Sequence, residues 1–77
     1  MKEACKAAIY RWASETDQAN AALGITDDAQ FIKLVIMLYR DRYNHLVTTG
    51  VTEWSDEPAI DEVLTKVKNG EMPNPLG

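Results

Sequence analysis

The sequence predicts a small all-α protein, a three-helix bundle in which two long helices form an antiparallel hairpin and a short third helix packs beside them. Three observations predict this class. Apolar residues recur at spacings of three and four, no segment shows the alternation of a strand, and a glycine follows each helical segment. We expect residues 1–70 to form one helical domain and residues 71–77 to form an extended or disordered tail that contains prolines.

The first predicted helix runs from about Lys2 to Leu23 and ends at Gly24, where a left-handed residue is favoured. Several alanines in this segment raise its helix propensity. One helix face has successive spacings of 4, 3, 4, 3 and 4 residues. It consists of Cys5, Ile9, Trp12, Thr16, Ala19 and Leu23.

The second predicted helix begins at Thr26 or Asp27, either of which can cap it, and continues to about Thr48 or Thr49 before Gly50. Its apolar residues fill an arc of roughly 220° at 100° per residue, whereas a surface helix needs a stripe of little more than about 100°. The arc consists of Phe31, Ile32, Leu34, Val35, Ile36, Leu38, Tyr39, Tyr43, Leu46 and Val47.

The third predicted helix starts within residues 55–58, where acidic residues precede Pro58, and it ends at Asn69 and Gly70. Its apolar positions follow the i, i+3, i+4, i+7 pattern. Pro73 and Pro75 prevent residues 71–77 from continuing the helix.

The wide arc of the second helix has two interpretations. Two neighbouring helices could flank and cover it, so that it is all core, or part of it could face another chain. Aromatic residues and arginines are enriched at protein interfaces. The second interpretation therefore selects seven candidate binding residues: Ile32, Ile36, Tyr39, Arg40, Arg42, Tyr43 and His45.

Arg42 and His45 are polar residues that fall within the apolar arc. The ordinary explanation is that the aliphatic part of Arg42 is buried while its guanidinium reaches water, and that His45 is half-exposed. The functional explanation is that they meet a carboxylate or phosphate across an interface, with Arg42 as a bidentate donor.

Composition excludes several classes of function. The net charge of −4 argues against charge-driven binding to nucleic acids or anionic membranes. One cysteine and one histidine supply neither a disulfide nor a four-ligand zinc site, and no motif indicates a cofactor. The most apolar run, residues 31–39, is too short to span a bilayer. We expect a cytoplasmic protein.

A catalytic function is also not expected. In a tight hairpin the positions of facing residues add up to about 50, which would place Cys5 near His45 and Trp12 near Leu38. A Cys–His pair is the minimum for thiol chemistry, but no third residue orients the histidine and no glycine-rich loop provides an oxyanion hole. We expect instead that Trp12, Leu38 and Leu64 are largely buried.

The sequence therefore favours a non-enzymatic protein-interaction module, a regulator or inhibitor that binds a protein partner or self-associates through the second helix. The alternative is a protein that binds a small anionic ligand of the nucleotide type. Its pocket would lie at a subunit interface and use Arg40 or Arg42 with Tyr39 or Tyr43.

Overall fold

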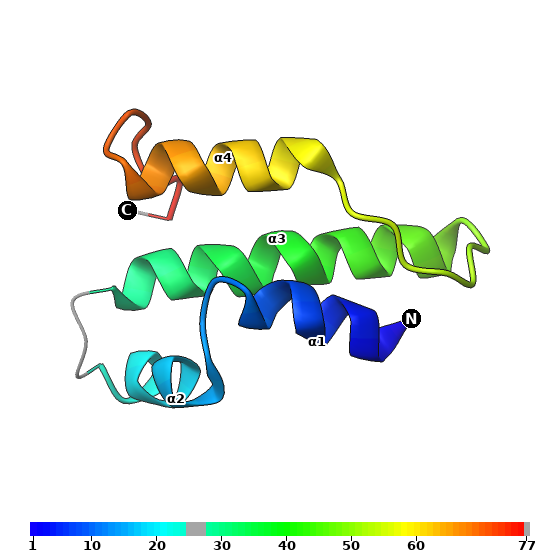
Figure 1. Ribbon diagram of the computed structural model, residues 1–77, viewed down its shortest axis with the longest axis horizontal. Coiled ribbons are helices and arrows are strands. Elements are labelled where there is room, and N and C mark those ends of the chain that lie inside the picture. The colour runs from blue at the N-terminus through cyan, green and yellow to red at the C-terminus, as the bar shows by residue number, and fades with distance from the viewer. Residues whose placement is uncertain (25–27, 77) are drawn as a thin grey trace.

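The computed structural model describes residues 1–24 and 28–76, and this part of the chain is helical without any strand (Figure 1). The all-α prediction is therefore confirmed, but the described residues form four helices in place of the predicted three. They are α1 (Lys2–Tyr10), α2 (Glu15–Leu23), α3 (Ala29–Thr48) and α4 (Pro58–Lys68). The molecule measures 37 × 26 × 17 Å.

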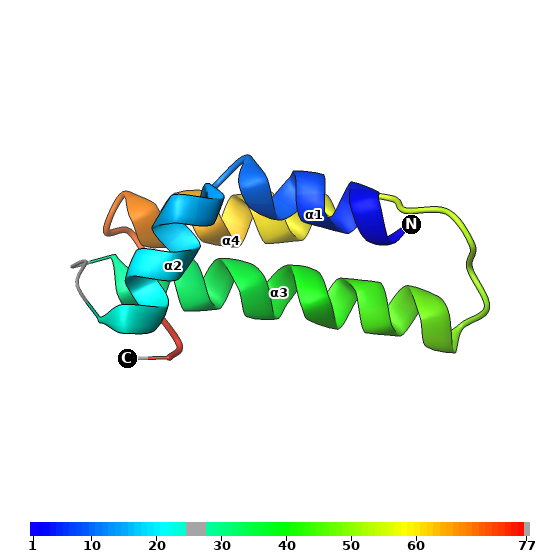
Figure 2. The ribbon, with the colours of Figure 1, turned by 90° about the horizontal axis from the view of Figure 1, so that it is seen from below.

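The first predicted helix is two helices, α1 and α2, and the prediction of a continuous helix is wrong. The reason is a capping box at Ser14, which starts a new helix. The Ser14 hydroxyl accepts from the Asp17 backbone N–H at 3.2 Å, and the Asp17 carboxylate accepts from the Ser14 backbone N–H at 3.1 Å. As a result α2 turns away from the axis of α1 (Figure 2), and Leu23 is exposed.

Helix α3 lies at the centre of the fold, where it packs against α1, α2 and α4. Both α1 and α4 run antiparallel to it, on opposite sides in Figure 1. Its first residue is Ala29, preceded by Asp28 as N-cap, and the predicted caps Thr26 and Asp27 lie outside the described residues. It ends before Gly50, as the sequence predicted, and Gly50 has a positive φ of 81°.

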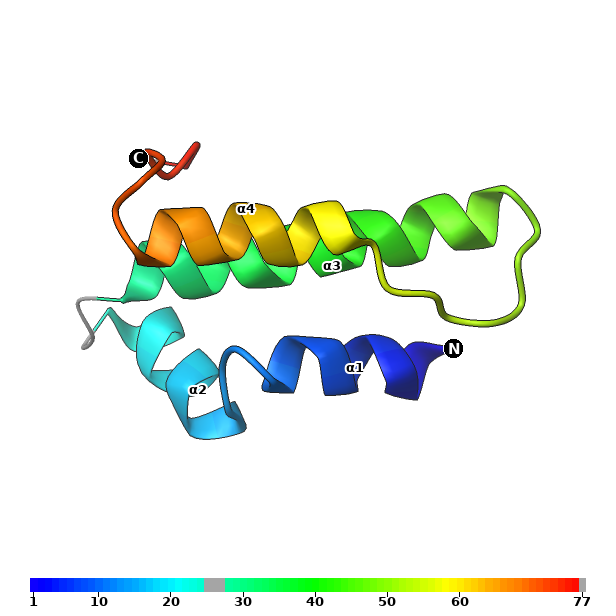
Figure 3. The same ribbon diagram turned by 45° about the horizontal axis from the view of Figure 1, so that its top comes forward.

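Helix α4 confirms the third predicted helix. Pro58 occupies its first turn, Ile60 and Leu64 are buried, and Gly70 follows its end with φ 76°. The loop from α3 and the chain beyond α4 are seen most clearly in Figure 3. Residues 71–76 contain bends and turns but no helix.

The core has two parts. Between α1, α3 and α4 lie Cys5, Ala8, Ile9, Leu34, Val35, Tyr39, Ile60 and Leu64. A smaller cluster of Ala13, Ala21 and Ile32 joins α2 to α3. Three helices thus cover most of the apolar arc of α3. Leu64 is fully buried as predicted, whereas Trp12 and Leu38 are only partly buried because they lie at the edges of the main core.

Candidate functional site

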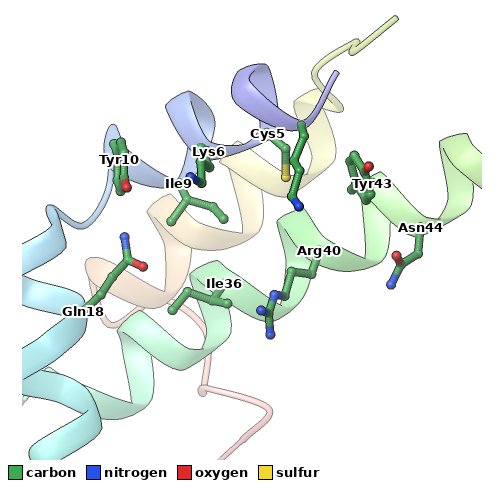
Figure 4. A pocket seen from close by; sticks show the side chains of 10 residues that line it. Cys5, Lys6, Ile9, Tyr10, Gln18, Ile36, Arg40, Tyr43 and Asn44 are labelled. Atoms are coloured by element: carbon green, nitrogen blue, oxygen red, sulfur yellow. The ribbon is translucent and has the colours of Figure 1, made fainter. Parts of the chain in front are cut away.

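An open groove of about 610 Å³ lies between α1 and α3 (Figure 4). We call it the α1–α3 groove. Its two sides run along the antiparallel helices, residues 2–10 of α1 facing residues 36–44 of α3. Its lining residues are Lys2, Cys5, Lys6, Ile9, Tyr10, Gln18, Ile36, Arg40, Tyr43 and Asn44.

The floor of the groove is apolar and well anchored. Cys5 and Ile9 are 6% and 9% exposed, and Ile36 is half-buried opposite them. The Cys5 thiol donates to the backbone carbonyl of Tyr39, with 3.6 Å between sulfur and oxygen. This contact and the packing of Ile9 hold α1 against α3. The groove therefore lies over core residues that join the two helices.

The rim of the groove is cationic. Lys2, Lys6 and Arg40 line it, and none of the described residues that line it is acidic. Within residues 1–24 and 28–76, none of these three cations forms an ion pair. The groove therefore concentrates positive charge in a chain whose net charge is −4.

Most cations on the α4 side are paired within the chain, whereas Lys68 at the end of α4 lies 5.9 Å from the centroid of the Trp12 ring. Four ion pairs lie there: Arg11–Asp56, Arg11–Asp61, Arg42–Glu57 and Lys66–Glu62. The carboxylates come from α4 and from the loop that precedes it. The two sides of α3 consequently differ: most cations on the α4 side are paired with carboxylates, whereas Lys2, Lys6 and Arg40 on the groove side form no ion pair with any described residue.

Arg42 belongs to the paired side. Its guanidinium lies 3.2 Å from the Glu57 carboxylate and donates to the carbonyl and the hydroxyl of Ser55 at 3.3 and 3.0 Å. The acidic partner that the sequence suggested across an interface is thus in the same chain, and Arg42 fastens the loop before α4 to α3. His45 is exposed and lines a hollow with Arg42 and Glu57, away from Arg40.

Tyr39 is 1% exposed, so it presents no ring surface to a partner or a ligand. Its hydroxyl donates to Asp61 at 2.6 Å and accepts from Trp12 Nε1 at 3.2 Å and from Arg11 at 3.5 Å. Burial, and next the hydrogen bond to Asp61, raises the pKa of Tyr39 to about 12. These residues join α1, α3 and α4, and their role is structural.

The seven residues selected from the sequence therefore do not form one site. Ile36, Arg40 and Tyr43 line the groove, whereas Arg42 and His45 lie on the paired side. Ile32 is 5% exposed and is buried with Ala13 and Ala21, so it faces α2 and not another chain.

Cys5 and His45 are not neighbours. Cys5 lies against Tyr39, and the Trp12 ring packs edge-on against Phe31 at 6.1 Å between centroids, so facing positions add up to 43 or 44 in place of 50. The break at Ser14 shifts this register because the connection to α3 includes a whole helix. Burial raises the pKa of the Cys5 thiol, and the opposing effect of Arg40 is smaller, which disfavours the reactive thiolate.

Sequence reasoning missed the α1 side of the groove, namely Lys2, Lys6 and Tyr10. The sequence feature that could have revealed them is their i, i+4, i+8 spacing. It places them on one helix face, beside the apolar face that contains Cys5 and Ile9.

The fold and groove define a small all-helical chain with an open groove that has an apolar floor and a cationic rim. No protein-family model matches it, and neither a curated protein nor a solved structure matches it. Among the described residues, no group of histidine, cysteine and acidic side chains could hold a metal ion. No described helix combines the length and apolar character needed to cross a bilayer.

Proposed function

We propose that this chain is a non-enzymatic protein-interaction module that acts as a regulator or inhibitor by binding a partner protein in the α1–α3 groove. The observation that carries the proposal is the combination of an apolar floor, at Cys5, Ile9 and Ile36, with a rim of cations that have no acidic partner among the described residues. Interfaces typically combine an apolar centre with a polar rim in this way.

The shape of the groove favours a macromolecular segment over a nucleotide. Each side extends over nine residues of helix, from the first to the last of which the helix rises about 12 Å. Tyr10 and Tyr43 lie at opposite ends (Figure 4), so they do not bracket a base beside Arg40. The small-anion alternative retains Arg40 and Tyr43 but loses Tyr39, which is buried, and Arg42, which is paired with Glu57.

A cytoplasmic location is part of the proposal. The one cysteine, Cys5, is a free thiol, and a small chain without a disulfide suits a reducing compartment.

Site-specific photocrosslinking tests the proposed function. Benzoylphenylalanine would replace Tyr10 or Asn44 at the groove and, as a control, the exposed Thr65 on α4. We expect irradiation of cells that express the chain to give a discrete protein adduct from Tyr10 and Asn44 but not from Thr65. Equal labelling from the three positions, or no adduct from folded groove variants, would contradict the proposal.

A further inference from the structure

We infer that the occupant of the α1–α3 groove is an acidic amphipathic helix of a partner protein. Its apolar stripe would pack on Ile9 and Ile36, and its flanking carboxylates would pair with Lys2, Lys6 and Arg40. This inference rests on the proposed function and adds the chemical class of the partner.

Charge complementarity indicates an acidic partner. Lys2, Lys6 and Arg40 supply three positive charges, and in the part of the chain that the structure describes no acidic residue lines the groove to neutralise them. The acidic residues that give the chain its net charge of −4 include Asp56, Glu57 and Asp61 on the α4 side, and these are already paired. Glu3 and Asp41 follow Lys2 and Arg40 in the sequence, but neither is among the described residues that line the groove.

The arrangement of the α3 side chains indicates a helix. Ile36, Arg40, Tyr43 and Val47 are spaced 4, 3 and 4 residues apart, which places them in one row on α3. Val47 is 49% exposed and continues this row beyond the groove lining. A row with this spacing packs against the ridges of another helix, and a groove of about 12 Å accommodates roughly two helical turns.

A second copy of the chain is a poorer occupant. Symmetric pairing through the groove would bring two sets of Lys2, Lys6 and Arg40 into one interface, which like-charge repulsion opposes. An asymmetric contact would need acidic residues of the other copy. Asp56 and Glu57, which directly precede α4, each already have an arginine partner in their own chain.

Labelled synthetic peptides test the inference. An 18-residue helical peptide with a leucine stripe flanked by glutamates would be compared with its lysine-flanked counterpart and with a scrambled glutamate peptide that lacks the stripe. Fluorescence anisotropy with the full chain should show the acidic amphipathic peptide binding at least about tenfold more tightly than either, because only it matches both charge and apolar pattern.

Two single charge reversals locate the binding. Lys6→Glu should weaken binding by about fivefold to tenfold, whereas Lys33→Glu, an equal change of charge at an exposed position outside the groove, should change it less than about twofold. Raising salt from 0.05 to 0.5 M should weaken binding to the wild type and should have a smaller effect on Lys6→Glu. Circular dichroism would confirm that both variants are folded.

Distinct outcomes would overturn the two proposals. Equal binding of acidic and lysine-flanked peptides, or equal effects of the Lys6 and Lys33 reversals, would overturn the acidic-helix assignment. The acidic-helix assignment would also be overturned if a nucleotide bound more tightly than the acidic peptide. It would equally be overturned if sedimentation showed a dimer that Lys6→Glu strengthens. If Tyr10 and Asn44 still crosslink to a protein, the proposed function survives this loss; if they do not, the proposed function itself fails.

Discussion

Replacing Tyr39 with phenylalanine tests the hydrogen-bonded cluster that joins three helices. The ring of Tyr39 would remain in the core, but the hydroxyl that donates to Asp61 at 2.6 Å and accepts from Trp12 at 3.2 Å would be lost. The experiment therefore separates the polar contribution of this residue from its packing.

The expected loss follows from the two bonds. A hydrogen bond to a charged acceptor contributes about 1.5–3 kcal/mol. Trp12 Nε1 keeps Asp61 as an acceptor at 3.3 Å, and the half-exposed Asp61 side chain can be hydrated, so the lower end applies. We expect Tyr39→Phe to lower the free energy of unfolding by about 1.5–2 kcal/mol, a large share of the roughly 4–12 kcal/mol typical of a chain this size.

The same contact predicts a pH dependence. The pKa of Tyr39 is raised from 10 to about 12 in the folded state, so its hydroxyl stabilises the fold below pH 10 and loses this effect as the pH rises to 12. A pKa difference of this size corresponds to about 2–3 kcal/mol of unfolding free energy. This is enough to cancel the greater stability of the wild type over Tyr39→Phe. Titratable groups that both proteins share change the two stabilities equally, so their effects cancel in the difference between wild type and Tyr39→Phe.

Urea unfolding of the wild type and Tyr39→Phe, followed by circular dichroism between pH 7 and 12, measures both effects. Tyr10→Phe is the control, because Tyr10 is 43% exposed and lies outside this cluster; it should change stability by less than about 0.5 kcal/mol. A Tyr39→Phe variant as stable as wild type at pH 7, or a stability gap that does not narrow toward pH 12, would refute the reasoning.

Three further predictions concern the fold and the thiol. Ser14→Ala should destabilise the chain by about 1 kcal/mol in urea unfolding, because α2 loses its capping box with Asp17; an unchanged midpoint would show that the cap is dispensable. Leu64→Ala should cost about 2–5 kcal/mol by the same assay, since Leu64 is fully buried, and a near-wild-type melting temperature would contradict its place in the core. Native Cys5 should react with iodoacetamide much more slowly than in urea at neutral pH, because burial raises its pKa; a fast native rate would argue for an activated thiol.

The parts of the fold that the sequence predicted correctly depend on local signals. Helix α4 has acidic residues and Pro58 at its start, an apolar pattern through Leu64 and Gly70 after its end, and each signal acts within a few residues. The break at Ser14 was also local, since Ser14 and Asp17 have the spacing of a capping box. It was missed because the alanine-rich sequence and the 4, 3, 4 spacing continue across it by coincidence.

The register of α1 on α3 could not be predicted in the same way. Pairing positions that add up to 50 assumes one hairpin turn, whereas the chain reverses through the break at residues 11–14, α2 and the connection to α3. Cys5 consequently faces Tyr39, six positions before His45, and the suggested Cys–His pair disappears. Interhelix register depends on packing between residues far apart in the chain, which periodicity within one helix does not contain.

The two arginines show which part of the candidate site was accessible from sequence. Arg40 and Arg42 are two residues apart in one helix, so their side chains are separated by about 200° around the helix axis. They therefore lie on nearly opposite faces and do not contact the same ligand. Helix geometry could have separated them. It could not say which one was free, because Arg42 is neutralised by a loop 13 to 15 residues away, at Ser55 and Glu57. Tertiary pairing thus decides which charges are available to a partner, and Lys2, Lys6 and Arg40 line a groove in which no described residue is acidic.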